Sequence, residues 1–83
     1  PDRKLYKTAR WQRLRRMVLE RDHWMCQQCL REGIETQPAS PEIDHIKPAN
    51  THPHLRYDLD NLQTLCKRCH SRKTHAEGIR DGR

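Results

Sequence analysis

Two cysteine pairs and an Asp-His dipeptide are the groups in this chain that could do chemistry. Each pair has the spacing Cys-x-x-Cys, and the 83 residues contain no other cysteine than Cys26, Cys29, Cys66 and Cys69. Four thiolates at this spacing can close a tetrahedral zinc site, which has no open position for a substrate. Such a structural site does not need Asp44, His45 or His70. The pattern therefore predicts a structural zinc site beside three residues of catalytic type.

Two other uses of the cysteines compete with zinc. Disulfides would also stabilise a small domain, but this basic sequence shows no secretory signal and no apolar stretch that could span a membrane. Residues 66–70 also spell the C-x-x-C-H pattern of haem attachment. A haem would leave Cys26 and Cys29 without a role, and the surrounding lysines and arginines would line a haem pocket poorly. Spacing and context favour zinc.

The composition predicts one small domain that needs a disulfide or a bound metal ion to stabilise its fold. Only 33% of the residues are hydrophobic and 5% are aromatic, with no Phe. A chain this short and polar buries little apolar surface against its conformational entropy. We therefore expect a single domain over 1–83, in which 1–7 form a flexible basic arm. A third possible function is that of a protein-interaction adaptor. Such a protein would need an exposed apolar or aromatic patch, and a chain with only four aromatic residues has few side chains to form one.

The charge distribution favours nucleic acid as the partner. The net charge is +6, and residues 1–31 carry nine Lys and Arg against three Asp and Glu. Residues 32–65 carry two against six, and residues 66–83 carry six against two. Basic ends around an acidic centre suit a phosphate-binding rim that encloses a metal-binding centre. Four side chains are the candidate contacts to the DNA backbone: Arg13, Arg16, Arg72 and Lys73.

Two helices are predicted to frame the candidate site. Trp11, Leu14 and Val18 recur at helical spacing, so a helix is expected from Thr8, as its N-cap, to about residue 23. A second helix is expected over 67–77, with Gly78 ending it. Successive helical residues lie about 100° apart, so the last cysteine and the histidine after it point in different directions.

The segment between the cysteine pairs predicts a short hairpin. The first pair should form a tight knuckle, residues 42–46 alternate as in a strand, and residues 62–65 fit a second strand or an extended segment. Asp44 and His45 would then point to opposite faces, so that one can bind a metal while the other addresses a nearby water. Residues 48–60 form a loop, in which His52 and His54 are interpreted as loop residues and not as metal ligands.

Residues 43–46 and 61–74 together resemble the HNH endonuclease family, in the compact four-cysteine type of phages and restriction systems. The named histidine, asparagine and histidine of that motif correspond to His45, Asn61 and His70. The resemblance covers 26–74, and the run from Asn61 onward is its most specific part. It implies an α+β fold, the small ββα-metal or His-Me finger fold, here with an N-terminal helix and the zinc staple.

The resemblance also implies the role of each site residue. His45 would take the proton from water, Asp44 and His70 would bind a catalytic Mg²⁺, Mn²⁺ or similar ion, and Asn61 would hold the loop that orients His45. Asn61 could also be a simple turn residue. Some relatives have a further histidine where this chain has Thr74, so two protein ligands are expected.

The expected function is a divalent-metal-dependent DNA endonuclease. One metal and one base predict that it nicks one strand at a time, with weak sequence specificity. Any stronger choice of site would come from a partner protein, and we expect action in the cytoplasm of a bacterial host. The alternative is a zinc-knuckle module that binds nucleic acid without cutting it, which the basic charge and four cysteines fit equally well.

Overall fold

A two-stranded antiparallel hairpin between helices forms the frame of the molecule. The computed structural model describes residues 7–82, so all of the predicted basic arm except Lys7 lies outside the described residues. The elements come in the order α2 (Ala9–Arg21), α3 (Gln27–Arg31), β1 (Glu42–His45), β2 (Leu62–Leu65) and α4 (Lys67–Gly82). Two short 3-10 turns, Pro53–Leu55 and Leu59–Asn61, lie in the loop between the strands. No helix of the described residues is long and apolar enough to cross a membrane.

The first predicted helix is confirmed, including its cap. Thr8 has an extended backbone, and its hydroxyl oxygen accepts a hydrogen bond from the Trp11 amide at 3.1 Å. Trp11 and Val18 are buried with Leu62, so one face of α2 packs on the hairpin. The chain leaves α2 through two consecutive left-handed residues, His23 and Trp24. This sharp exit directs the chain into the first cysteine pair.

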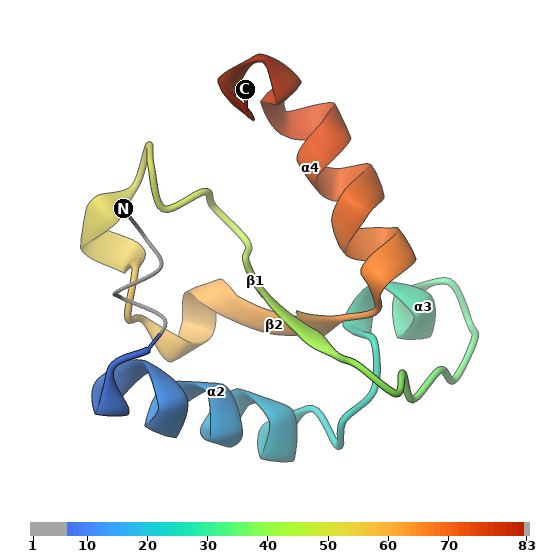
Figure 1. The fold of residues 1–83 in the computed structure, drawn as a ribbon. Coiled ribbons are helices and arrows are strands. Elements are labelled where there is room, and N and C mark those ends of the chain that lie inside the picture. The colour runs from blue at the N-terminus through green and yellow to red at the C-terminus, as the bar shows by residue number, and fades with distance from the viewer. Residues whose placement is uncertain (1–6, 83) are drawn as a thin grey trace.

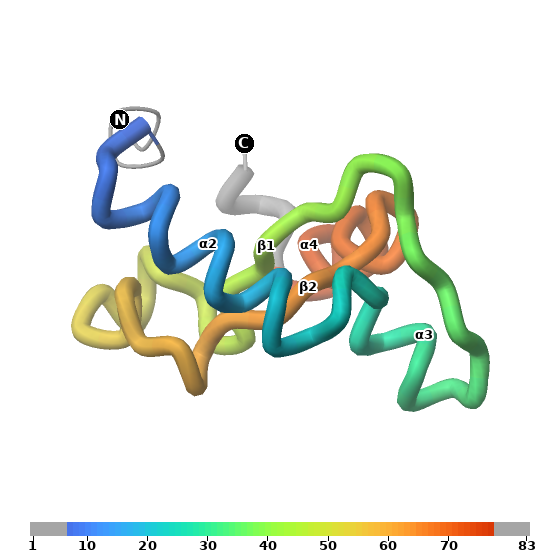
Figure 2. Tube along the Cα trace, turned by 90° about the horizontal axis from the view of Figure 1, so that it is seen from below, coloured from blue at the N-terminus to red at the C-terminus, as the bar shows by residue number. Residues whose placement is uncertain are grey.

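The register of the hairpin decides which side chains meet. Glu42 pairs with Leu65, and Asp44 pairs with Gln63, in an antiparallel ladder. Directly opposite residues share a face, and successive residues along a strand point to opposite faces. The helix α2 lies on one face of the hairpin, and α4 lies on its other side (Figures 1 and 2). The α+β fold expected from the sequence, with an N-terminal helix, a hairpin and a C-terminal helix, is confirmed.

A charged pair joins the end of α2 to the second strand. Arg21 donates to the carbonyl oxygens of Leu59 at 2.9 Å and Leu62 at 2.7 Å. Asp22, which binds the same guanidinium, accepts the Thr64 amide at 2.9 Å. The hydrogen bond to Asp22 raises the pKa of Arg21 above its ordinary value. These contacts fix β2, and with it the hairpin, on α2.

The five-residue helix α3 begins directly after Cys26, whose sulfur accepts the Cys29 amide, so the predicted knuckle continues into a helix. One detail of the predicted elements needs correction. The prediction that Gly78 ends the last helix is wrong, since α4 continues to Gly82. One glycine inside a helix costs only about 1 kcal/mol, which the backbone bonds of the continuing helix can offset.

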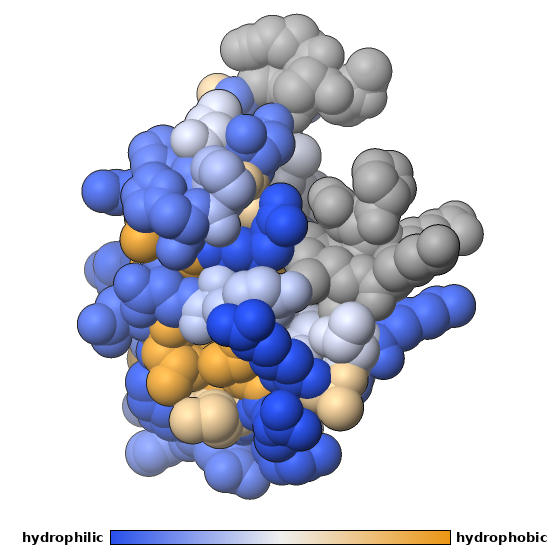
Figure 3. Space-filling view, turned by 90° about the vertical axis from the view of Figure 1, so that its left-hand side faces the viewer, coloured by the Kyte–Doolittle hydropathy of each residue, from blue (hydrophilic) through white to orange (hydrophobic). Residues whose placement is uncertain are grey.

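The surface agrees with the polar composition. Figure 3 shows a face that is mostly hydrophilic, with hydrophobic side chains gathered in one small area. The large hydrophobic side chains that are exposed among the described residues come from four different segments: Met17, Trp24, Ile34 and Ile46. The core is correspondingly small and is divided into a group around Trp11 and a group around the cysteines.

Candidate active site

The four cysteines meet in one cluster. Their sulfur atoms all lie within 4.8 Å of one another, and the sulfurs of Cys29 and Cys69 are 3.8 Å apart. A disulfide needs about 2.05 Å between sulfurs, whereas a tetrahedral ion with Zn–S bonds of about 2.3 Å sets them about 3.8 Å apart. All four cysteines are free thiols, and the cluster geometry fits a metal ion and not a pair of disulfides.

The pKa of Cys69 also favours a cation at this cluster. Burial, with hydrogen bonds from the other three cysteines, raises the pKa of the Cys69 thiol to about 12. A buried thiol of this kind gives up its proton only when a cation takes the place of that proton. Leu65 packs against the cluster and seals it from the hairpin side. The cluster is therefore suited to a closed, structural metal site that joins α3 to the start of α4.

Asp44 and His70 face each other between β1 and α4. Asp44 Oδ1 lies 3.5 Å from His70 Nε2, and only 4% of Asp44 is exposed. The other ring nitrogen, His70 Nδ1, donates to Glu42 Oε1 at 2.5 Å. A carboxylate can only accept, so this bond assigns a proton to Nδ1 and leaves Nε2 as the ring nitrogen that could bind an ion beside Asp44. The pair presents one oxygen and one nitrogen ligand side by side.

Two further side chains hold the second oxygen of Asp44. Gln63 Nε2 donates to Asp44 Oδ2 at 2.9 Å, and Lys73 Nζ lies 3.3 Å from the same oxygen. Lys73 also donates to the His45 carbonyl at 3.0 Å and pairs with Glu77. These contacts turn Oδ2 toward the protein, so Oδ1 is the oxygen available to an ion. The carboxylate is therefore oriented by its neighbours before anything binds.

His45 is held on the opposite face of β1, as the alternation predicts. Its ring stacks on Trp11 with centroids 5.5 Å apart, and its Nε2 lies 3.0 Å from the Arg56 carbonyl oxygen. Because a carbonyl oxygen can only accept, Nε2 carries the proton in the neutral ring and Nδ1 is the unprotonated nitrogen. The imidazole thus has one fixed tautomer, with Nδ1 free to accept a proton.

Asn61 fastens the loop that supplies this carbonyl. Its Oδ1 accepts the Lys47 amide at 2.9 Å, while its Nδ2 donates to the carbonyls of Lys47 at 3.1 Å and Leu55 at 3.3 Å. Asn61 is buried, and its own carbonyl accepts the Ile46 amide. One side chain therefore ties the start of the loop to its middle, and the residue directly after Leu55 is the one whose carbonyl holds His45.

The remaining candidates form none of the contacts to Asp44 described above. Arg13 and Arg16 are exposed on α2, and Arg72 is exposed on α4 with its guanidinium 3.6 Å from Glu32. The rings of His52 and His54 lie tilted to each other in the loop with centroids 5.9 Å apart, and neither belongs to a metal-binding cluster of the described residues. The assignment of the four basic side chains to DNA stays a prediction.

Three residues at the site escaped the sequence analysis. Glu42 orients His70, Gln63 orients Asp44, and Trp11 supports the ring of His45. The strand pattern of the sequence could have indicated Glu42 and Gln63. Glu42 lies two positions before Asp44 on the same strand, and Gln63 lies opposite Asp44 on the other strand, so both share its face. Trp11 was recognised only as a core residue of its helix.

Comparisons with known proteins identify the family of this chain. The HNH endonuclease family matches residues 26–76. The Gene 4 protein of Mycobacterium phage D29 is 36% identical over 62 residues, which cover 75% of this chain and 55% of that protein. A protein of Lactococcus phage SK1, described as a probable HNH endonuclease, is 33% identical over 73 residues, with coverage of 83% of this chain and 73% of that protein. The chain thus spans about half the length of the mycobacteriophage relative.

A solved structure extends the likeness to the fold. The crystal structure of the HNH endonuclease of the deep-sea thermophilic bacteriophage GVE2, with a manganese ion, superposes with a TM-score of 0.85. The two sequences are 41% identical, and the match covers 94% of this chain and 83% of that one. The chain belongs to the HNH endonuclease family. Both the resemblance of residues 61–74 to this family and the fold it implied are confirmed.

Proposed function

We propose that this protein is a divalent-metal-dependent endonuclease that hydrolyses phosphodiester bonds of DNA. The observation that carries the proposal is the pairing of Asp44 Oδ1 with His70 Nε2 at 3.5 Å. Asp44 lies on the same strand as His45, whose Nε2 is held by the Arg56 carbonyl. A zinc-knuckle module that only binds nucleic acid needs neither feature. The manganese ion in the related phage GVE2 enzyme supports a metal-dependent reaction here.

Asp44 and His70 are the residues that would hold the catalytic ion. Adjacent ligands of an octahedral Mg²⁺ or Mn²⁺ ion lie about 3 Å apart, close to the 3.5 Å between Asp44 Oδ1 and His70 Nε2. A carboxylate, one imidazole and waters suit these ions. When bound, the ion would supply a Lewis acid that neutralises charge on the phosphate and on the departing oxygen.

His45 serves as the general base in this proposal. Its Nδ1 accepts a proton from the attacking water, while the bond from Nε2 to the Arg56 carbonyl steadies the ring and favours the positive charge it acquires. Trp11 prevents the ring from turning, and Asn61 holds the loop that carries the carbonyl. General-base catalysis of this kind contributes about 10²–10⁴ in rate.

The cluster of four cysteines is assigned to zinc. Sulfur ligands at tetrahedral spacing in a closed, largely buried site are typical of structural zinc. The ion would fix α3 against α4, and α4 carries His70, so it acts on the active site only through the fold. The basic side chains Arg13, Arg16, Arg72 and Lys73 are proposed as backbone contacts, which explains an expected weak sequence preference. Phage relatives support action in the cytoplasm of a host cell.

Glu42 is expected to strengthen metal binding without touching the ion. Replacing Glu42 by glutamine removes the charge that holds the proton on His70 Nδ1, so the affinity for Mn²⁺ should fall about tenfold. Asp44→Asn, which removes a ligand, should cause a larger loss. Titration of free Mn²⁺ by electron paramagnetic resonance measures both. Glu35→Gln, at an exposed loop carboxylate, is the matched control, and an Mn²⁺ affinity of Glu42→Gln equal to that of this control would contradict the role of Glu42.

Plasmid cleavage tests the proposed function directly. The described residues contain one Asp-His pair of this kind and one oriented base, so each binding event should break one strand. Supercoiled plasmid with Mn²⁺ should become open circle before linear DNA appears, and EDTA should stop the reaction. A gel time course monitors the three forms. Linear product without an open-circle intermediate would exclude a single-site monomer, and no cleavage with any divalent ion would favour the binding module.

A further inference from the structure

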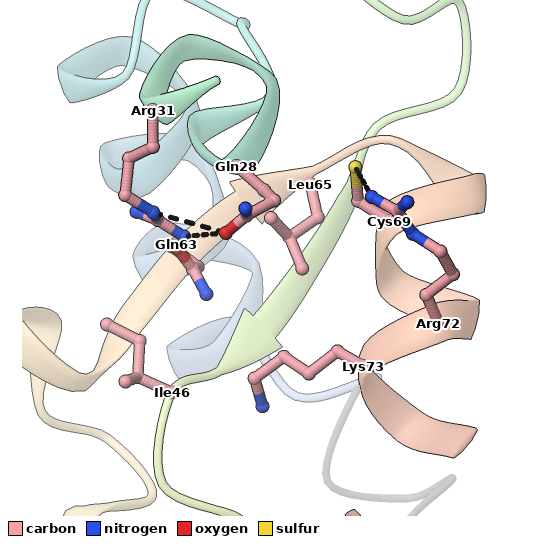
Figure 4. A pocket seen from close by; sticks show the side chains of 8 residues that line it. All are labelled: Gln28, Arg31, Ile46, Gln63, Leu65, Cys69, Arg72 and Lys73. Carbon is pink, nitrogen blue, oxygen red and sulfur yellow. Dashed lines mark hydrogen bonds between the residues drawn. The ribbon is translucent and has the colours of Figure 1, made fainter. Parts of the chain in front are cut away.

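A basic pocket adjoins the active site on the α3 and α4 side of the hairpin. It has a volume of about 370 Å³ and lies between α3, the hairpin and the first turns of α4 (Figure 4). Three cationic side chains line it, Arg31, Arg72 and Lys73, together with the amides of Gln28 and Gln63. No Asp or Glu of the described residues lines it. The lining therefore favours an anionic occupant.

Arg31 is the cation in this pocket that has no carboxylate partner among the described residues. Lys73 lies against Asp44 and Glu77, and Arg72 lies 3.6 Å from Glu32. Arg31, by contrast, forms no ion pair with any carboxylate of the described residues. Arg31 is exposed at the end of α3, so its charge is solvated by water and is not paired with a protein anion. A bound phosphate would supply the missing partner.

The guanidinium of Arg31 is nevertheless fixed in place. Its Nε and Nη2 donate to Gln28 Oε1 at 3.2 and 2.8 Å, and Nη2 also donates to Gln63 Oε1 at 3.1 Å. Figure 4 shows these side chains converging at one end of the pocket. The bonds leave both N–H groups of Nη1 without a partner among the described residues. A donor held in one orientation loses little side-chain entropy when it binds an anion.

The same contacts connect Arg31 to the catalytic carboxylate. Gln63 is buried, and because its oxygen faces Arg31, its nitrogen must face Asp44, to which it donates at 2.9 Å. One amide side chain thus separates the free guanidinium edge from the expected metal ligand. A DNA strand whose scissile phosphate lies at Asp44 and His70 would bring a neighbouring phosphate close to Arg31.

We propose that this pocket is a phosphate subsite, in which Arg31 Nη1 binds a backbone phosphate next to the scissile one. The proposal rests on the proposed nuclease function, because it places the scissile phosphate at Asp44 and His70. The subsite would align the strand with the metal ligands and would contribute affinity without reading the base sequence. It adds a DNA contact from α3, which the sequence pattern did not indicate.

Metal-free DNA binding tests the subsite separately from catalysis. A short fluorescein-labelled duplex is titrated with protein in EDTA, and binding is measured by anisotropy at several salt concentrations. Arg31→Gln should weaken DNA binding about tenfold. It should also reduce the slope of log affinity against log salt concentration by about one. The control is Arg68→Gln, which removes an equal charge from an exposed position of α4 outside the pocket. Its effect should be clearly smaller. Arg31→Lys, which keeps the charge, should retain the salt dependence of the wild-type protein.

Three outcomes would overturn the subsite, and each is recognisable. If Arg31→Gln matches Arg68→Gln in DNA affinity but binds Mn²⁺ more weakly, Arg31 only positions Gln63 and Asp44. If Arg31→Gln does not fold, the test is made on the wild-type protein, by following the NMR resonance of the Arg31 side chain while metal-free duplex is added. A resonance that does not shift excludes the contact between Arg31 and DNA. If the wild-type protein cuts plasmid yet its metal-free binding is unaffected by salt, the nuclease proposal survives and the subsite does not. Failure to cut plasmid, by contrast, refutes the nuclease proposal itself.

Discussion

Replacing His45 by alanine is expected to lower the rate of plasmid cleavage by about 10²–10⁴-fold. The imidazole is the only group in the proposal that removes a proton from water, and its Nδ1 is free because Nε2 donates to the Arg56 carbonyl. The metal ligands Asp44 and His70 project elsewhere, so Mn²⁺ affinity should change little. Single-turnover rates with a supercoiled plasmid at saturating Mn²⁺ measure the loss.

The matched control for this substitution is His54→Ala. His54 lies exposed in the loop between the strands and contacts only His52 among the rings described. Its removal should leave the cleavage rate near that of the wild-type protein. Circular dichroism and metal-free DNA affinity should be unchanged in both variants. If His45→Ala cuts plasmid as fast as His54→Ala, His45 is not the general base.

Replacing Cys26 by serine is expected to unfold the domain or leave it largely insoluble. The cysteine group is one of only two buried clusters of the described residues, and without its ion it holds α3 and α4 together by few apolar contacts. In zinc-finger peptides the apparent free energy of zinc binding is about 10–16 kcal/mol at neutral pH, and it is expressed as folding free energy. Zinc content by elemental analysis and thermal unfolding by circular dichroism measure the effect.

Cys26→His provides the control for the loss of a ligand. Histidine nitrogen can replace one sulfur in a tetrahedral zinc site, so this variant should keep about one zinc per chain and stay folded. Mild EDTA treatment of the wild-type protein should remove the catalytic ion before the zinc. A Cys26→Ser protein with a full equivalent of zinc and an unchanged unfolding temperature would show that the cluster does not stabilise the fold. A stable, metal-free and oxidised wild-type protein would favour disulfides.

Local patterns were enough to predict most of the fold. Thr8 could be recognised as a cap because its hydroxyl precedes an amphipathic run, and such a bond depends only on residues within one helical turn. The strand at Glu42–His45 could be recognised from alternation, and the meeting of the cysteines from the chemistry of zinc. Gly78 was misjudged because a glycine weakens a helix without ending it, and local propensity does not decide whether the next residues continue the helix.

The contacts that orient the site could not be predicted in the same way. Glu42 meets His70, and Arg31 meets Gln63, across large separations in the chain. Their meeting depends on the register of the hairpin and on the angle at which α4 leaves it, which local propensity does not determine. The loop that carries the Arg56 carbonyl has no periodic pattern at all, so the tautomer of His45 became assignable only from the structure.

The joining of two distant cysteine pairs also has a consequence for the timing of synthesis. A ribosome releases α2, α3 and β1 before it releases β2 and α4. Until Cys66 and Cys69 have emerged, the first pair cannot complete a four-sulfur cluster, and Asp44 has no His70 beside it. Under the proposed function, a nascent chain that lacks α4 would therefore have no complete pair of metal ligands. A producing cell would then meet the proposed cleavage activity only after α4 has been translated and the cysteine cluster has bound its ion.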